Sequence, residues 1–478
     1  MSIVVAFFVN AALNFALGLL VAKFLGPSDF GRYAVAMAVA IVLNTLAFEW
    51  LRLSATRFYS EARRTAEPGI RATLDLGYAA AALVLVALVL AASLAGLEAG
   101  LPVPLLAVAT GAAIGMAMFD YRAALARARF LDRAYSRLVL FKNLVAFGLM
   151  VGGAYLFREP ALVLAGAAAS GGLALLVARG ILADCGATPA AAERRHLAAF
   201  ASYAVPLVAA NLIYQLIPLL NRSALAVTDG YAEAGQFALA ADVGLRIFMT
   251  IGSALDLLLF QLVVRTDESH GRAEAEAQVA RNLALVVALL LPLAAGYWLA
   301  MPAFEALVVP ASYRGSFAIY STILIPALFA FALIQYALNP VFQLKRRTGP
   351  VVLAAFVALA VNAALLAILP ERAGPQGVAI GQLAGLAAAA LLFTIMAVRQ
   401  GGLRLPWRDI GLAGLATAAM VLALLPLRSL DPPALALGLV TIGGAGIYAA
   451  IAYALDMAGL RVLLRARFSR RSVLAPAE

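Results

Sequence analysis

Charged and hydroxyl side chains recur at helical spacing within an apolar part of the chain, residues 234–263. These side chains are Asp242, Arg246, Ser253 and Asp256. Steps of three, four or seven residues bring side chains to one face of an α-helix, so the four groups are expected to share a face. Asp242 precedes Arg246 by four residues, the favourable order for an ion pair within a helix. A guanidinium binds phosphate groups through paired hydrogen bonds, so this face predicts anion binding beside titratable acids.

Neighbouring apolar segments carry polar side chains in similar patterns. The groups at helical spacing are Asn211, Gln215 and Arg222 in residues 203–226, Glu49 and Arg52 at the end of residues 33–51, and Asn14 in residues 3–25. Polar groups within a bilayer are costly and face a cavity or one another. The stripes therefore predict a hydrated cavity between helices.

Each of the three arginines also has a structural interpretation that involves no ligand. Asp242 would neutralise Arg246 as a purely structural ion pair. Arg222 would extend to the headgroup layer from the end of its span, and Arg52 would act as an ordinary cytoplasmic anchor.

The elements that position these side chains are transmembrane helices. The chain of 478 residues is 64% hydrophobic and only 13% charged, whereas soluble domains carry about 25% charged residues. Apolar runs of about 20 residues recur along the whole length, each long enough to cross a bilayer. We count fourteen, at 3–25, 33–51, 73–96, 103–121, 138–157, 161–180, 203–226, 234–263, 282–300, 316–340, 350–369, 377–398, 410–427 and 434–457. The sequence predicts an all-α, polytopic membrane protein.

Basic residues gather on one predicted side of the membrane. Of the 36 Lys and Arg, 28 fall in the connections after even-numbered spans, at the adjoining span ends (Lys142 and Arg179) or in the C-terminal tail. This imbalance predicts that these connections and both termini are cytoplasmic. Topology thus explains the net charge of +11, and no nucleic-acid partner is expected.

The connections do not favour an enzyme. None exceeds about 20 residues, which leaves no room for a separate catalytic domain. The two histidines, His196 and His270, lie beside charged runs, and the single cysteine is Cys185. We therefore expect no catalytic residue, no metal site and no cofactor, and the absence of a phosphate-binding loop motif argues against ATP hydrolysis. The first apolar run lacks a charged leader and is expected to be a retained span.

An internal repeat links the two halves of the chain. Residues 31–36 (GRYAVA) align with residues 235–240 (GQFALA) at an offset of 204, and both follow a predicted outer turn. Six spans per half in equal orientation predict a parallel repeat about an axis along the membrane normal. The expected organisation is an N-terminal lobe at 1–182, a cytoplasmic linker at 183–202, a C-terminal lobe at 203–398, and two further spans with a basic tail at 399–478.

The stretch LGPSDFGRYA at 25–34, after a span with Asn10 and Asn14, resembles the opening of the polysaccharide-biosynthesis flippases. These belong to the multidrug/oligosaccharidyl-lipid/polysaccharide exporter (MOP) superfamily. QLKR at 343–346, Asn362 and GPQGVA at 374–379 are similar to later spans of that family. The resemblance implies two six-helix lobes around a central cavity. It also implies alternating-access transport of undecaprenyl-pyrophosphate-linked oligosaccharide to the outer leaflet of the bacterial inner membrane for surface polysaccharide assembly.

The implied ligand suggests a role for each polar group. Arg246, Arg222 and Arg52 would bind the pyrophosphate. Sugar hydroxyls would meet Asn211, Gln215, Asn14 and Ser253. Proton or cation coupling would use Asp242, Asp256 or Glu49. The expected partners are the lipid-linked sugar, membrane lipid, protons or cations, and the polysaccharide polymerase machinery.

Two other functions are open. A cation-coupled drug antiporter of the same superfamily would have a cavity dominated by buried acids, and Arg246 argues against it. A membrane enzyme of glycan assembly would need catalytic groups in ordered loops, which the short outer connections do not provide.

Overall fold

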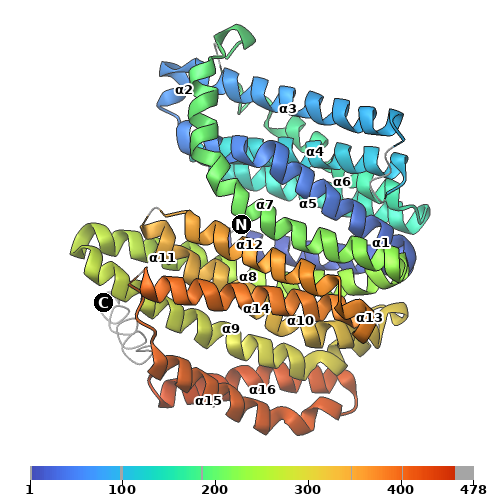
Figure 1. Ribbon diagram of the computed structural model, residues 1–478, viewed down its shortest axis with the longest axis vertical. Coiled ribbons are helices and arrows are strands. Elements are labelled where there is room, and N and C mark those ends of the chain that lie inside the picture. Colours follow the sequence, from blue (N-terminus) through green and yellow to red (C-terminus); the bar gives the residue numbers. More distant parts are fainter. Residues whose placement is uncertain (1–2, 97–100, 185–186, 346, 401, 458–478) are drawn as a thin grey trace, which may run out of the picture. The chain divides into compact units, whose positions relative to one another are not determined.

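The computed structural model describes residues 3–96, 101–184, 187–345, 347–400 and 402–457, and within these ranges every regular element is helical (Figure 1). Side chains at 3–10, 178, 256, 257 and 260 lie outside the described part of the chain, and those of Asn10 and Asp256 are among them. The all-α prediction is confirmed.

The predicted number of spans is also confirmed. Thirteen helices of the described chain are long and apolar enough to cross a membrane. The first of them, labelled α1 (Ile3–Phe58), consists of two helices, which correspond to the first two predicted spans and meet at a kink at Gly26 (Figure 1). Gly26 makes this kink with a φ of 74° and a ψ of 172°, a conformation that glycine adopts without the strain of a Cβ atom. Pro27 follows directly and cannot continue the helical hydrogen bonds.

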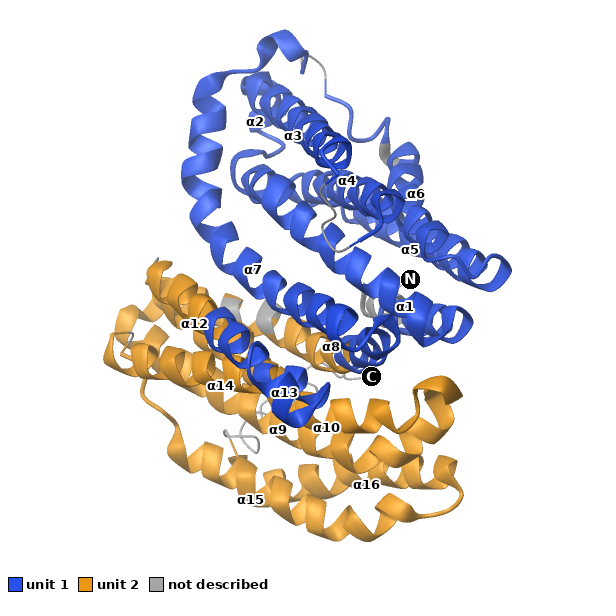
Figure 2. Ribbon diagram, turned by 45° about the vertical axis from the view of Figure 1, so that its right-hand side comes forward, with its two compact units in different colours: residues 1–243, 359–381 blue, residues 244–358, 382–478 orange. Residues whose placement is uncertain are grey.

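The described chain forms two compact units, shown in different colours in Figure 2. Unit 1 comprises residues 1–243 and 359–381, and unit 2 comprises residues 244–358 and 382–478. Unit 1 thus contains segments from both halves of the predicted repeat. The lobe boundaries at 182 and 398 stay a prediction.

Unit 1 is assembled around α1, which packs against α3, α4, α5, α6 and α7. Its helices are α1, α2 (Arg63–Ala66), α3 (Pro68–Leu94), α4 (Val103–Ala128), α5 (Asp132–Leu156), α6 (Pro160–Ala178), the short η1 (Pro189–Ala191), α7 (Arg194–Thr228), the beginning of α8 (Tyr231–His270), the end of α12 (Gly349–Leu366), α13 (Leu369–Ala373) and the first turns of α14 (Gln376–Arg399). One buried core of unit 1 includes stacked rings of Phe48, Tyr78 and Tyr121.

Unit 2 is assembled around α9 (Arg272–Val308), a helix long enough to span the bilayer and extend beyond it. The other elements of unit 2 are η2 (Ala311–Tyr313), α10 (Ser316–Leu333), η3 (Ile334–Leu338), α11 (Asn339–Leu344), α15 (Trp407–Leu424), η4 (Leu425–Ser429), α16 (Pro433–Ala454) and the remaining parts of α8, α12 and α14. The last two spans, α15 and α16, pack on α9 through a small core that includes Leu299, Met420 and Val440.

Large apolar side chains are exposed along many of the helices. Leu83 and Leu88 on α3, and Ile442 on α16, are more than half exposed. Water would make this surface strongly unfavourable, whereas lipid solvates it. The chain is therefore a multi-pass membrane protein.

One span of unit 2 departs from regular α-helix. Residues 316–344 form a continuous span in which η3 is a π-helical turn between α10 and α11. Such turns insert one residue into the helix and often occur at functional sites.

Candidate functional site

A buried ion pair joins α7 and α8 within unit 1. Nη2 of Arg222 lies 2.5 Å from Oδ1 of Asp242. The Arg222 side chain is only 7% exposed and that of Asp242 is 34% exposed. The sequence pattern predicted Arg246, one turn along the same helix, as the partner of Asp242, but the carboxylate pairs with Arg222 across the α7–α8 hairpin. Arg222 is more deeply buried than Arg246. Its guanidinium therefore loses more hydration and gains more from a carboxylate partner.

Arg222 also bonds to the backbone of α1. Its Nη1 donates a hydrogen bond of 3.2 Å to the carbonyl oxygen of Ala34. The neighbouring Asn221 is fully buried, and its Oδ1 accepts a 2.9 Å bond from Nδ2 of Asn362 on α12. The side chain of Arg222 is therefore buried and does not extend toward lipid headgroups. Its guanidinium becomes available to another ligand only if these contacts open.

A second charged group lies within the bundle of unit 1. Glu49 and Arg52 on α1 form an ion pair in which Nε of Arg52 lies 2.9 Å from Oε2 of Glu49. Asp120 on α4 interacts electrostatically with Arg52 and with Lys142 on α5. Tyr78 on α3 is buried beside them, and its hydroxyl has no hydrogen-bond partner among the described residues. Acids and bases therefore lie close together within this bundle, and Arg127 on α4 also interacts electrostatically with Asp120.

Unit 2 brings polar groups to the π-helical turn. The hydroxyl of Tyr336 donates to Sδ of Met249 on α8 at 2.9 Å. Directly after this turn, Nδ2 of Asn339 on α11 donates to Oε1 of Gln335 within the turn at 2.6 Å. A Cβ atom on Gly252 would lie 1.9 Å from the ring of Tyr336, so only glycine allows this approach. The π-helical turn thus lies directly against the face of α8 that the sequence pattern predicted to be functional.

Most of the other predicted site residues with described side chains are half-buried. Asn14 on α1, and Asn211 and Gln215 on α7, are half-buried in unit 1. Arg246 is half-buried in unit 2, and Ser253 is exposed with its hydroxyl bonded to the carbonyl of Met249 at 2.7 Å. Direct contacts between predicted site residues in the described part of the chain include the pairs Arg222–Asp242 and Glu49–Arg52.

A third cluster of charged side chains lies around Asp184 in unit 1. The sequence patterns did not predict it. Asp184, 3% exposed, accepts hydrogen bonds from Arg64 at 3.2 Å, from Arg71 at 3.3 Å and from Tyr59 at 2.5 Å. Arg129 completes the ion pairs of Asp184 at 3.8 Å. Burial and the hydrogen bond to Asp184 raise the pKa of Tyr59 to about 12. One carboxylate thus ties together the segment after α1, the helices α2 to α4, and the segment after α6.

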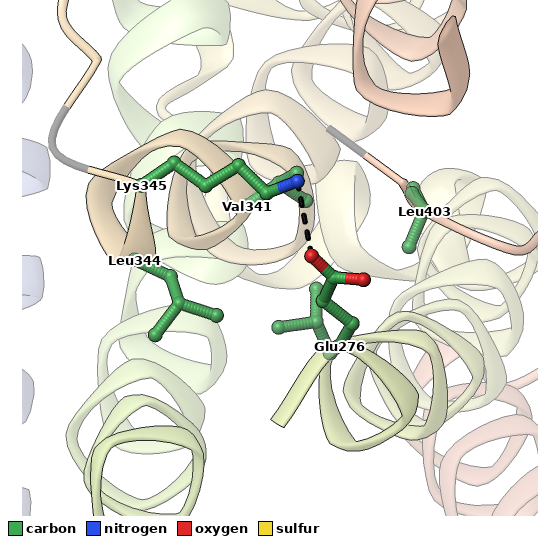
Figure 3. Close-up of a pocket in the computed structure, with 6 residues that line it drawn as sticks. Glu276, Val341, Leu344, Lys345 and Leu403 are labelled. Carbon is green, nitrogen blue, oxygen red and sulfur yellow. Dashed lines mark ion pairs between the residues drawn. The ribbon is translucent and has the colours of Figure 1, made fainter. Parts of the chain in front are cut away.

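The cavity drawn in Figure 3 is too small for a lipid headgroup. It lies in unit 2, lined by Glu276, Lys345, Leu403 and three further residues, Val279, Val341 and Leu344. Its volume of about 10 Å³ is roughly that of one water molecule. Lys345 and Glu276 form an ion pair of 3.0 Å across it, joining α9 to the end of α11 (Figure 3). Among the described residues, no three His, Cys, Asp or Glu side chains are grouped so that they could hold a metal ion.

Solved structures resemble the chain along most of its length. The lipid II flippase MurJ in an inward closed conformation matches with a TM-score of 0.75 at 14% identity, covering 97% of this chain and 100% of MurJ. An inward-facing multidrug resistance transporter of the MATE family matches with a TM-score of 0.57 at 14% identity, over 82% of this chain and 94% of that one. A MOP superfamily transporter from Pyrococcus furiosus, described as having a binding pocket of reverse polarity, matches with a TM-score of 0.55 at 12% identity, over 83% and 94%.

The chain has the fold of a MOP superfamily transporter. No family model matches its sequence, and no curated protein matches it either. At 12–14% identity the similarity concerns the fold alone. The roles of the polar side chains in this MOP-fold chain are therefore inferred from their own contacts.

Proposed function

We propose that this MOP-fold protein is a flippase that carries a polyprenyl-pyrophosphate-linked sugar from the cytoplasmic to the outer leaflet of a bacterial inner membrane. The observation that supports this most is the extent of the match. MurJ, a lipid II flippase, covers 97% of the chain with a TM-score of 0.75, whereas the MATE transporter covers 82% with a TM-score of 0.57. The charge distribution favours cytoplasmic termini, so the basic connections would face the leaflet in which a lipid-linked sugar is made.

Arginine is the side chain best suited to a pyrophosphate within the membrane, because its planar guanidinium donates paired hydrogen bonds. Arg246, half-buried on α8, and Arg52, partly exposed on α1, are the proposed ligands. Arg222 would join them only after release from Asp242. Asn14, Asn211, Gln215 and Ser253 would bind sugar hydroxyls, while the polyprenyl chain stays in lipid.

An energy source is needed if transport is to run uphill. Glu49, Asp242 and Asp256 are the proposed protonation or cation-coupling groups. Protonation of Glu49 or Asp242 would release a paired arginine, Arg52 or Arg222, and so link proton uptake to anion binding. The released sugar would pass to the polymerase machinery of surface polysaccharide assembly.

The test is translocation of a fluorescent, pyrophosphate-linked sugar in reconstituted vesicles, followed by reduction of the outward-facing dye. Arg246→Ala should slow translocation by roughly tenfold to a hundredfold, the effect of losing charge-assisted hydrogen bonds, and Arg246→Lys should restore only part of the rate. Arg281→Ala is the matched control, because Arg281 is exposed and pairs with Glu274 near the beginning of α9. A wild-type rate in a correctly inserted Arg246→Ala variant would contradict the assignment.

The MATE match and the acids Glu49 and Asp120 within helices favour one second candidate, a cation-coupled drug antiporter. The same vesicles distinguish the two functions. An antiporter would accumulate a lipophilic dye cation when a proton or sodium gradient is applied, and it would leave the lipid-linked sugar in its original leaflet.

A further inference from the structure

The ion pair between Glu49 and Arg52 on α1 occupies the edge of the guanidinium that an anion would bind. Nε of Arg52 donates to Oε2 of Glu49 at 2.9 Å, and Nη2 of Arg52 donates to Oε1 of Glu49. Two parallel hydrogen bonds of this kind are also the geometry in which arginine binds a phosphate group. Glu49 thus takes the position on Arg52 that a phosphate would take.

This pair differs from an ordinary surface pair with the same spacing on α1. Asp29 and Arg32 are also three residues apart, but Nη1 of Arg32 lies 3.5 Å from Oδ1 of Asp29, and the side chains of Asp29 and Arg32 are 36% and 51% exposed. The side chain of Glu49 is only 11% exposed, whereas that of Arg52 is 31% exposed. The carboxylate is therefore withdrawn from solvent while the guanidinium is still open to a ligand.

The ion-paired Arg222 is less accessible than Arg52. Its side chain is 7% exposed, and its guanidinium donates to the carbonyl of Ala34 as well as to Asp242. Of these two arginines, Arg52 is the one that an anion can reach without opening a helix contact.

A buried hydroxyl beside the pair is available to a displaced Glu49. Tyr78 on α3 is 4% exposed, and its hydroxyl has no hydrogen-bond partner among the described residues. It interacts electrostatically with Glu49, Arg52 and Asp120. A buried hydroxyl without a partner is unfavourable, and a carboxylate would be a strong acceptor for it. A phosphate that replaces Glu49 on Arg52 therefore leaves the carboxylate with a donor.

We propose that Glu49 is the internal counter-ion of Arg52 in the empty transporter, displaced when pyrophosphate binds and restored when pyrophosphate leaves. The proposal rests on the proposed function, because it concerns a carrier that must return without its cargo. During alternating access the cavity closes to both sides, so Arg52 loses its remaining water. An uncompensated guanidinium is then costly, whereas the pair with Glu49 allows the empty protein to return. This role differs from proton coupling, since Glu49 stays charged in the empty state.

The first experiment measures the binding of inorganic pyrophosphate to the purified protein by calorimetry in phosphate-free buffer. Glu49→Gln removes the competing carboxylate, so it should tighten binding by roughly tenfold to a hundredfold, the effect of charge-assisted hydrogen bonds to one guanidinium. Asp29→Asn is the matched control, because it removes the acid of the exposed pair with the same spacing, and its affinity should equal that of the wild type. Unchanged or weaker binding in Glu49→Gln would overturn the proposal.

The second experiment separates net transport from exchange. Vesicles of uncharged phosphatidylcholine carry the fluorescent pyrophosphate-linked sugar in one leaflet, with or without unlabelled pyrophosphate lipid in the other. Glu49→Gln should slow translocation by roughly tenfold or more when the opposite leaflet lacks pyrophosphate lipid. The unlabelled lipid should restore most of the rate, because this variant returns only when loaded, whereas the wild-type rate should change little.

Two outcomes of this assay decide between a counter-ion and a structural role for Glu49. Glu49→Asp keeps the charge and should retain net transport in the absence of unlabelled lipid. Equal losses of net transport and of exchange in Glu49→Gln would indicate a structural role and contradict the proposal.

A double variant, Glu49→Gln with Arg52→Gln, does not depend on the folding of the single variant, because neither partner is left with an unpaired charge. It should bind pyrophosphate more weakly than the wild type by roughly tenfold or more. Its net transport and exchange should fall by the same factor, since no guanidinium at position 52 needs a counter-ion. Wild-type affinity, or a loss of net transport alone, would show that Glu49 does not act through Arg52. If the wild type moves no lipid-linked sugar at all, the proposed function fails, while the pyrophosphate affinities still test the replacement of Glu49 on Arg52.

Discussion

Replacing Asp242 by asparagine removes the counter-ion of a buried guanidinium without changing the shape of the side chain. Arg222 is 7% exposed, so it cannot regain water without rearrangement of α7 and α8. Removing one partner of a buried ion pair costs about 3–5 kcal/mol. Because Asp242 itself is 34% exposed, we expect the lower end, about 3 kcal/mol, or roughly a hundredfold in the unfolding equilibrium.

The assay is reversible unfolding in mixed micelles, with a matched surface pair as control. Asp29 and Arg32 lie 3.5 Å apart but are 36% and 51% exposed, so Asp29→Asn should cost less than about 1 kcal/mol. A double variant with Arg222→Met and Asp242→Asn should regain much of the loss, because no uncompensated charge stays buried. Equal costs for Asp242→Asn and Asp29→Asn, or no recovery in the double variant, would refute the assigned burial of Arg222.

Two further predictions concern the group around Asp184. Asp184→Asn should lower the free energy of unfolding by about 3 kcal/mol, because several guanidiniums lose a buried carboxylate, while Glu61→Gln, 54% exposed, should cost less than about 1 kcal/mol in the same assay. Tyr59→Phe should destabilise the protein by a constant amount below pH 10. Since folding raises the pKa of Tyr59 to about 12, that stabilisation is full below the unfolded pKa near 10 and is lost as the pH rises through about 12. A stability difference that persists unchanged above pH 12 would contradict the hydrogen bond to Asp184.

The number of spans was predictable because it depends on one local property. A helix that crosses lipid needs about 20 apolar residues and leaves no backbone group unpaired, and both requirements are visible in a window of that length. The break after Leu25 was equally local, because Gly26 and Pro27 stop regular helix through their own backbone chemistry. What hydropathy could not show is how abrupt this break is, because the two helices on either side of Gly26 meet with no loop between them.

Ion-pair partners were less predictable, because pairing depends on packing between helices. Spacing within one helix favoured Arg246 as the partner of Asp242, whereas the hairpin brought Arg222 to it instead. Lys142 was counted among the basic residues of a connection, but it lies within α5 beside Asp120. The one available signal was that Asp120 falls inside an apolar run, where an acid needs a partner.

Asp184 illustrates a different limit. It lies in a polar connection, where an isolated acid is ordinarily solvated, and its partners come from positions 59, 64, 71 and 129. These positions lie 55 to 125 residues from Asp184 in the sequence, and they meet because the helices between them pack against one another. A sequence pattern within any one connection does not contain that information.

The internal repeat is kept in a backbone contact of this protein but not in its buried ion pairs. The backbone contact at Gly31 and Gly235 obeys the offset of 204 in both directions, so the repeat is maintained where the helices touch. The same offset places Gly18 opposite Arg222 and Ala38 opposite Asp242, so the ion pair that holds α7 and α8 to Ala34 exists in the second half alone. The symmetric contact at Gly31 and Gly235 forms between backbone atoms, so it requires no charged side chain. An ion pair beside it in one half only makes that side of the contact depend on charge, so the two halves are equivalent in backbone packing but not in electrostatics.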